Sequence, residues 1–176
     1  MELVDLGPCR AFWSEVGAET AVLLPGRSGG GLQPAFVHLR ELLVGRGRSV
    51  LAVHDEFHGG DHVAWPRERA LAAFAFREPS LVVGKSMATF AAAVVDAPAI
   101  WLTPLLHEPQ VREAIHAPAL VVGGTADPSW DGEAARSLGV EVLELEGVHH
   151  GLAIEGDAHA SLDAMRRLVD AVAAFL

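Results

Sequence analysis

The sequence predicts an α/β domain in which a mostly parallel sheet of about six strands is covered by helices on both faces. Short apolar runs alternate along the chain with segments whose apolar residues recur at helical spacing. Most of these runs are rich in valine and leucine and are apolar throughout, as expected of strands that are buried on both sides. Strands of this kind are typical of a parallel sheet between two layers of helices.

The expected elements follow one another in regular order. The predicted parallel strands are residues 21–24, 50–53, 81–83, 99–102, 119–122 and 140–145. The predicted helices are residues 34–45, 66–77, 87–95, 110–116, 132–138 and 158–176. Upstream of the first parallel strand, residues 3–6 and 10–15 are compatible with an antiparallel hairpin around Gly7 and Pro8.

Length and composition narrow the class of protein. With 176 residues, the chain is long enough for one buried core, and we expect a single domain over residues 1–176. The formal net charge of −10 argues against a nucleic-acid partner. Cys9 is the only cysteine, so no disulfide can form within the chain and a reducing compartment fits. No secretory signal or membrane-spanning run is visible, and we therefore expect a cytoplasmic protein without a membrane partner.

The segment GKSMA at residues 84–88 follows an apolar strand and precedes an alanine-rich helical segment. A serine in such a strand-to-helix turn projects its hydroxyl from the sheet, and small residues two positions to either side relieve crowding. Gly84 and Ala88 are those small residues, and the backbone amide of Met87 is placed to stabilise an oxyanion. Ser86 is therefore a candidate nucleophile, although the pattern alone also fits an ordinary helix-capping serine.

A serine nucleophile needs a base, and the base needs a carboxylate to orient it. The segment GGTADP at residues 123–128 places Asp127 after the fifth predicted parallel strand, and EGVHHG at residues 146–151 places two histidines after the sixth. Ligands bind at the carboxyl ends of parallel strands, so these loops are expected to meet at one edge of the sheet. The resulting chain order is Ser, Asp, His.

This order and these three loops resemble the α/β-hydrolases, in particular small bacterial members related to dienelactone hydrolase. The resemblance covers nearly the whole chain and implies an α/β-hydrolase fold without a cap, with Ser86, Asp127 and His150 as the catalytic triad. In this family the catalytic base often stands directly before a small residue and an apolar one. His150 precedes Gly151 and Leu152 in this way, so it is favoured over His149. Asp127 is favoured over Asp131 and Glu155 because it directly follows the glycine turn.

The resemblance also implies a second oxyanion amide in the loop PGRSGG at residues 25–30. Arg27 is the expected donor, and the amide of Ser28 stays open as the alternative. Proline stands here where the family often has histidine, and Ala88 replaces the usual second glycine of the serine turn. Dienelactone hydrolase itself uses a cysteine nucleophile, so its lactone substrate does not carry over to Ser86.

The connection between the fourth and fifth predicted parallel strands is short, which leaves little room for a lid and favours an open, shallow site. We expect Leu105, Leu106 and His107 to form one wall of the substrate pocket, with Ser28 also near it. The expected function is hydrolysis of small carboxylic esters or thioesters through an acyl-enzyme, with a small-molecule acyl substrate and no cofactor. Whether the chain forms a homodimer stays open.

A second group of residues offers a different function. The segment HDEFHGGDH at residues 54–62 holds three histidines and three carboxylates after a predicted strand, and such ligands suit zinc. Their spacing matches no recognised metal motif, so we expect a polar loop without metal. The alternatives to a serine hydrolase are therefore a non-catalytic relative of that fold and a metal-binding protein built on His54, His58 and His62.

Overall fold

The computed structural model describes residues 1–176 and contains one sheet. Its six parallel strands correspond to the six predicted ones, so the mostly parallel α/β architecture is confirmed. In chain order these strands are β3 (Thr20–Leu24), β4 (Ser49–His54), β5 (Leu81–Lys85), β6 (Ala99–Leu102), β7 (Ala119–Gly124) and β8 (Glu141–Leu145).

The sheet has eight strands rather than about six, because the N-terminal hairpin joins it. Strands β1 (Glu2–Asp5) and β2 (Arg10–Ser14) pair antiparallel, and β2 pairs antiparallel with β4. The order across the sheet is β1-β2-β4-β3-β5-β6-β7-β8. Alternate residues of β2 are buried, so this strand has the half-buried pattern of an antiparallel edge and lacks the continuous apolar run of the parallel strands.

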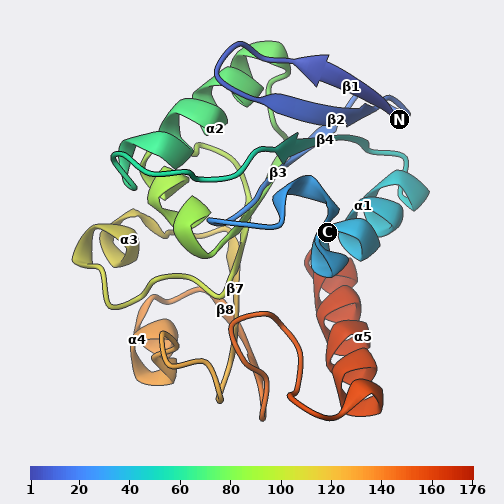
Figure 1. Cartoon of the computed structure of the whole chain (residues 1–176). Coiled ribbons are helices and arrows are strands. Elements are labelled where there is room, and N and C mark those ends of the chain that lie inside the picture. The colour runs from blue at the N-terminus through green and yellow to red at the C-terminus, as the bar shows by residue number, and fades with distance from the viewer.

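Helices cover both faces of the sheet (Figure 1). Helices α1 (Pro34–Gly45) and α5 (Ala158–Phe175) pack against each other on one face. The other face is covered by α2 (Ala64–Phe76), α3 (Pro109–Ala114), α4 (Gly132–Ser137) and the 3₁₀ helix η2 (Ser86–Val94). A second 3₁₀ helix, η1 (Gly30–Leu32), precedes α1. None of these helices combines the length and apolar character needed to cross a membrane.

Two hydrophobic cores lie on opposite sides of the sheet. Successive strand residues point to opposite faces, so Val82 belongs to the core under α2 and η2 whereas Val83 belongs to the core under α1 and α5. Both valines are fully buried. This two-sided burial explains why the parallel strands are apolar at every position, and it fixes the direction of each side chain at the strand ends.

Candidate active site

Ser86 occupies a sharp turn between β5 and η2. Its φ of 53° lies in the left-handed region that non-glycine residues rarely adopt, as expected of a strained strand-to-helix elbow. Gly84 is required next to this turn, because a Cβ there would lie 2.4 Å from an atom of the fully packed Trp101 ring. Met87 is the second residue of η2, where backbone amides lack acceptors within the helix. The turn therefore presents both a hydroxyl and a helix N-terminus at the carboxyl edge of the sheet.

The imidazole of His150 lies between Ser86 and Asp127. Its Nε2 is 2.7 Å from Ser86 Oγ, and its Nδ1 is 2.7 Å from Asp127 Oδ2. The carboxylate is almost completely buried, whereas the imidazole is 38% exposed and accessible to a reactant. The structure thus brings together the three side chains that the sequence predicted to meet.

The neighbouring histidine has a different contact. Nδ1 of His149 accepts a hydrogen bond of 2.8 Å from the backbone N–H of Gly151. Both residues lie in the β8–α5 loop, residues 146–157, so the His149 ring is hydrogen-bonded to the backbone of its own loop. Of the other predicted alternatives, Asp131 caps α4 by accepting a hydrogen bond from Ala134 N, and Glu155 is exposed.

Gly124 lets the β8–α5 loop approach the end of β7. A Cβ at this position would lie 2.1 Å from the carbonyl oxygen of Val148, two residues before His150. The backbone of the loop is also tied to this region by a hydrogen bond from Ala126 N to Val148 O, at 3.1 Å. Gly124 therefore allows direct contact between the loop that carries Asp127 and the β8–α5 loop that carries His150.

Ser129 completes the surroundings of Asp127 and was not foreseen from the sequence. Its hydroxyl donates to Asp127 Oδ1 at 2.7 Å, and its backbone N–H donates to the same oxygen at 2.9 Å. The hydroxyl also lies 3.1 Å from His150 Nδ1. A serine two residues after an aspartate is a turn signal, and this spacing is the one local pattern that could have singled it out.

Burial and hydrogen bonding act in opposite directions on the carboxyl group. Burial by itself raises the pKa of Asp127, but the hydrogen bonds from Ser129 and from His150 outweigh it and hold the pKa below its ordinary value of 3.8. Asp127 is thus kept ionised at neutral pH. A buried carboxylate at this position orients the imidazole and stabilises its protonated form.

Lys85 is a further polar residue that the sequence did not assign a role. Its side chain is buried, and Nζ donates a hydrogen bond of 3.1 Å to the backbone carbonyl of His150. Burial lowers the pKa of Lys85 from its ordinary value of 10.5, whereas the Asp127 carboxylate acts to raise it. An amine therefore lies beneath the loop that carries the imidazole.

The loop predicted to supply the second oxyanion amide passes beside the serine. A Cβ at Gly26 would lie 3.1 Å from Ser86 Cβ and 3.7 Å from Ser86 Oγ, so backbone reaches the vicinity of the hydroxyl. The carbonyl of Arg27 accepts a hydrogen bond from Phe57 N at 3.0 Å, which ties this loop to the segment after β4. The side chains of Arg27 and Ser28 are both exposed.

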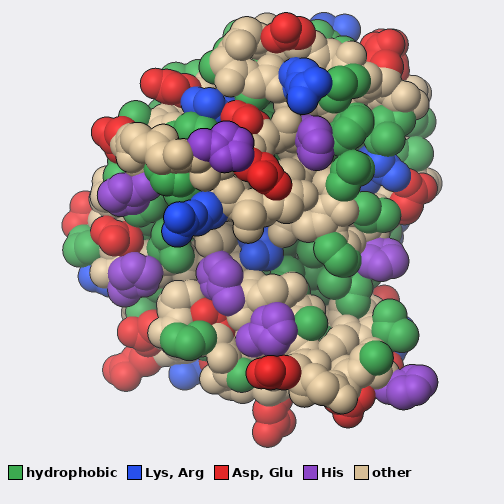
Figure 2. All heavy atoms as spheres, in the orientation of Figure 1, with side chains coloured by type: hydrophobic (Ala, Val, Ile, Leu, Met, Phe, Trp, Pro, Cys, Tyr) green, Lys and Arg blue, Asp and Glu red, His purple; other side chains and the backbone are tan.

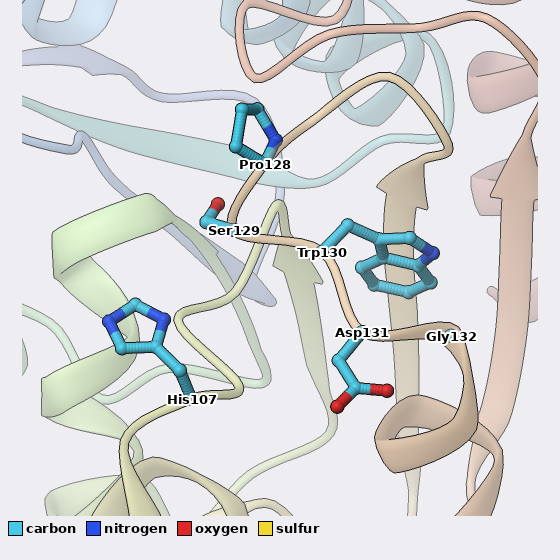
Figure 3. Close-up of a pocket in the computed structure, with 6 residues that line it drawn as sticks. All are labelled: His107, Pro128, Ser129, Trp130, Asp131 and Gly132. Carbon is cyan, nitrogen blue, oxygen red and sulfur yellow. The ribbon is translucent and has the colours of Figure 1, made fainter.

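A hollow of about 670 Å³ adjoins the acid side of the site (Figure 3). It is lined by His107, Pro128, Ser129, Trp130, Asp131 and Gly132. Figure 3 shows the His107 ring on one side of this space and the loop of residues 128–132 on the other. Its lining includes the polar side chains of His107, Ser129 and Asp131, and it connects to the hydrogen-bonded group through Ser129.

Of the four predicted pocket residues, only His107 lines this hollow. Leu106 is fully buried in the core under α2 and η2, so its assignment to a pocket wall is wrong. Leu105 is half-buried against the same core, and Ser28 lies on the other loop. An apolar residue after a strand packs inward where the core has room, and the sequence does not reveal that choice.

The histidine-rich segment forms no metal-ligand cluster, since no three His, Cys, Asp or Glu side chains in the chain converge in that way. Figure 2 shows the histidines of this face spread across it. His54 packs against Phe12, with ring centroids 4.8 Å apart, and His62 packs against Phe90. Asp61 accepts hydrogen bonds from the amides that begin α2, and these bonds lower its pKa.

Solved structures with the same architecture cover nearly the whole chain. A putative α/β hydrolase from Agrobacterium tumefaciens superposes with a TM-score of 0.76 at 15% identity, over 97% of this chain and 94% of its own. For an α/β serine hydrolase homologue from Coxiella burnetii, the TM-score is 0.73 at 14% identity, over 97% and 96% of the two chains.

A dienelactone hydrolase from Anabaena variabilis superposes with a TM-score of 0.74 at 12% identity, over 99% of this chain and 94% of its own. No protein-family model matches the sequence, and no curated protein is significantly similar to it. Similarity at these identities concerns the backbone and its topology. The chain therefore has the α/β-hydrolase fold that its sequence motifs predicted.

Proposed function

We propose that this protein is a serine hydrolase that cleaves small carboxylic esters or thioesters through an acyl-enzyme formed on Ser86. The observation that carries the proposal is the pair of 2.7 Å contacts that link Ser86 Oγ, His150 and Asp127. A hydroxyl, an imidazole and a buried carboxylate in this arrangement form the usual nucleophile, base and orienting acid of acyl transfer. The structural similarity to a serine hydrolase homologue from Coxiella burnetii supports the proposal.

Acylation begins with proton transfer from Ser86 Oγ to His150 Nε2. The oxygen attacks the carbonyl carbon, and the carbonyl π electrons move to its oxygen. Asp127 stabilises the imidazolium that forms. The backbone amides of Met87 and Arg27 are the proposed donors to the oxyanion, because one begins a helix and the other lies in the loop beside Ser86. Donors fixed in advance lower the energy of the tetrahedral intermediate more than that of the substrate.

The intermediate collapses when the carbon–oxygen or carbon–sulfur bond to the leaving group breaks. His150 gives its proton to the departing alcohol or thiol, which leaves an ester between the acyl group and Ser86. Water then enters, His150 takes a proton from it, and the hydroxide oxygen attacks the acyl carbon to form a second oxyanion. This intermediate collapses when the bond from the acyl carbon to Ser86 Oγ breaks, and His150 returns the proton to Ser86 as the acid is released. Each step uses groups of the chain and water.

The surroundings of the site favour small or protruding acyl groups. Only residues 103–118 separate β6 from β7, and α3 accounts for six of them, so little chain is available to cover Ser86. The adjoining hollow is open, and polar side chains of His107, Ser129 and Asp131 are part of its lining. A buried acyl chain of a long lipid would need a deep apolar channel, and short acyl groups fit the site better.

A fluorophosphonate probe and the model ester p-nitrophenyl acetate test this proposal. We expect the native protein to be labelled at Ser86, as located by peptide mass spectrometry, and to hydrolyse the ester. Ser86→Ala should abolish labelling and lower kcat/KM by at least about a thousandfold. Ser137→Ala, on the surface of α4, is the matched control and should retain both. A native fold that neither reacts nor turns over would instead identify a non-catalytic relative.

A further inference from the structure

Lys85 is the only lysine of the chain and is the last residue of β5, directly before Ser86. Its side chain is only 8% exposed. Lysine is rarely buried to this extent, because removing an ammonium group from water is costly unless a partner compensates for it. A single lysine that is buried beside the candidate nucleophile therefore needs a specific explanation.

The side chain of Lys85 points toward the part of the β8–α5 loop that carries His150. Leu81 and Val83 contribute to the core under α1 and α5, and alternation along β5 sends Lys85 to the same side. Val148 and Leu152, which flank His150, pack into that core as well. A hydrogen bond of 3.1 Å from Lys85 Nζ to the carbonyl of His150 joins the end of β5 to the β8–α5 loop.

The ammonium group is incompletely compensated. It can donate three hydrogen bonds, one of which goes to the His150 carbonyl, and no carboxylate forms an ion pair with it. Asp127 is the charged side chain that acts on it, and this attraction does not offset the effect of burial, which leaves the pKa of Lys85 lowered. The buried ammonium group of Lys85 therefore lowers the free energy of unfolding compared with an uncharged side chain of similar length.

We propose that Lys85 is a positioning residue of this site, whose ammonium group holds the main chain of His150 so that the imidazole stays between Ser86 and Asp127. The inference rests on the proposed function, since it assigns Lys85 to the same reaction. Residues 146–157 connect β8 to α5 without a helix or strand. The bond from β5 therefore fixes, at the residue that carries the base, a segment that has no regular secondary structure of its own.

Three variants test this positioning role. Lys85→Met removes the donor and the charge and keeps an unbranched side chain. Lys85→Gln keeps a donor for the His150 carbonyl without the charge. Arg48→Met is the matched control, because it also removes one positive charge from a largely buried side chain but lies at the start of β4, where Arg48 pairs with Glu19 and Ser80.

The expected results distinguish positioning from a merely structural role. Lys85→Met should lower kcat for p-nitrophenyl acetate by about ten- to a hundredfold, with the melting temperature unchanged or raised. Lys85→Gln should recover part of kcat, because it restores a donor to the His150 carbonyl. Arg48→Met should keep wild-type kinetics. A wild-type kcat in Lys85→Met, or a loss of kcat that follows a loss of folded protein, would overturn the proposal.

A second readout does not depend on turnover. The proton between His150 Nδ1 and Asp127 should give a low-field proton NMR signal in the wild type, which should broaden or vanish in Lys85→Met and persist in Arg48→Met. A signal that is identical in Lys85→Met contradicts the positioning role. If Lys85→Met loses the signal but the wild type reacts with neither ester nor fluorophosphonate, the proposed hydrolase function is refuted and the positioning role is not.

Discussion

At the scale of single residues, the groups around Asp127 determine how far the pH can fall before its carboxylate is protonated. Two hydrogen bonds from Ser129 converge on Oδ1 of the carboxylate, and His150 binds the other oxygen. Ser129 therefore stabilises the charged form of a carboxyl group whose pKa burial by itself raises. Its contribution should be visible both in stability and in the pH dependence of activity.

Because the pKa of Asp127 is lower in the fold than its ordinary value of 3.8, the carboxylate stabilises the fold above that pH. The contribution is lost as the pH falls through the lowered folded value. Ser129→Ala removes one hydrogen bond to the charged form, so the pKa should move back toward its ordinary value. We expect the free energy of unfolding at neutral pH to fall by about 1 kcal/mol.

Urea unfolding of Ser129→Ala between neutral pH and a pH of about 2 tests this expectation. The variant should lose less stability on acidification than the wild type, because less of its stability depends on the ionised carboxylate. Ser137→Ala, whose hydroxyl bonds only a carbonyl of its own helix, should follow the wild-type curve. Parallel curves for wild type and Ser129→Ala would contradict the role given to this hydroxyl.

At the scale of elements, the site depends on how closely loops from different strands approach one another. Gly124 ends β7 against the carbonyl of Val148, and Gly26 lies against Ser86. Neither approach leaves room for a Cβ without displacement. These glycines determine where the catalytic loops lie, although they contribute no side chain to the reaction.

Gly124→Ala should push the β8–α5 loop away from β7 and move His150 with it. The added Cβ would lie 2.1 Å from the Val148 oxygen, so we expect a loss of about 1–3 kcal/mol in the free energy of unfolding. Fluorophosphonate labelling should slow by about a hundredfold in the molecules that remain folded.

Gly45→Ala is the control for this substitution. Gly45 is the last residue of α1, and a Cβ there would meet no atom within 4 Å. Alanine should stabilise this helix by about 0.5–1 kcal/mol and leave labelling unchanged. Equal labelling rates in the two alanine variants would show that the loop tolerates displacement and would contradict a role of Gly124 in placing His150.

The elements themselves were largely predictable, and the reason is burial on both faces. A strand such as β6 is apolar at every position because both cores contact it, so its place in the chain is visible without knowledge of its neighbours. The edge strand β1 has no such signal, since its residues are mostly exposed. The hairpin itself was expected at residues 3–6 and 10–15, where the structure has β1 and β2, but it was not counted as part of the sheet, so the strand count was too low by two.

The site was predictable only in part. Ser86, Asp127 and His150 could be proposed because each follows a strand, and parallel strands end at one edge of the sheet. The role of Lys85 depends on the direction of its side chain at the end of β5, and that of Ser129 depends on hydrogen bonds within its loop, so the sequence alone assigned neither. Leu106 was misplaced for a related reason, because an apolar residue after a strand can line a pocket or fill a core.

At the scale of the whole molecule, stability depends on two cores that the sheet separates. Helix α5 closes one of them through buried residues at helical spacing, which include Leu168 and Val172. The same helix exposes other apolar residues, and Leu162 is 65% exposed. One helix therefore offers a buried and an exposed leucine for comparison.

Leu168→Ala should lower the free energy of unfolding by about 2–5 kcal/mol, because the substitution leaves a cavity under a sheet that cannot collapse into it. Leu162→Ala should change it by less than about 0.5 kcal/mol. Urea unfolding of both variants measures the difference. Similar values for the two would mean that α5 contributes little to closing this core.

The sheet also ends in two open edges, and its charges bear on how copies of the chain meet. An unpaired strand exposes backbone donors and acceptors to which another chain can add. Strand β1 carries Glu2 and Asp5, and β8 carries the exposed Glu141 and Glu144. Two copies that approached edge to edge would bring carboxylates together on chains that already carry a net charge of −10. The acidic edges thereby oppose growth of the sheet from one molecule into the next, which is the first step of ordered aggregation.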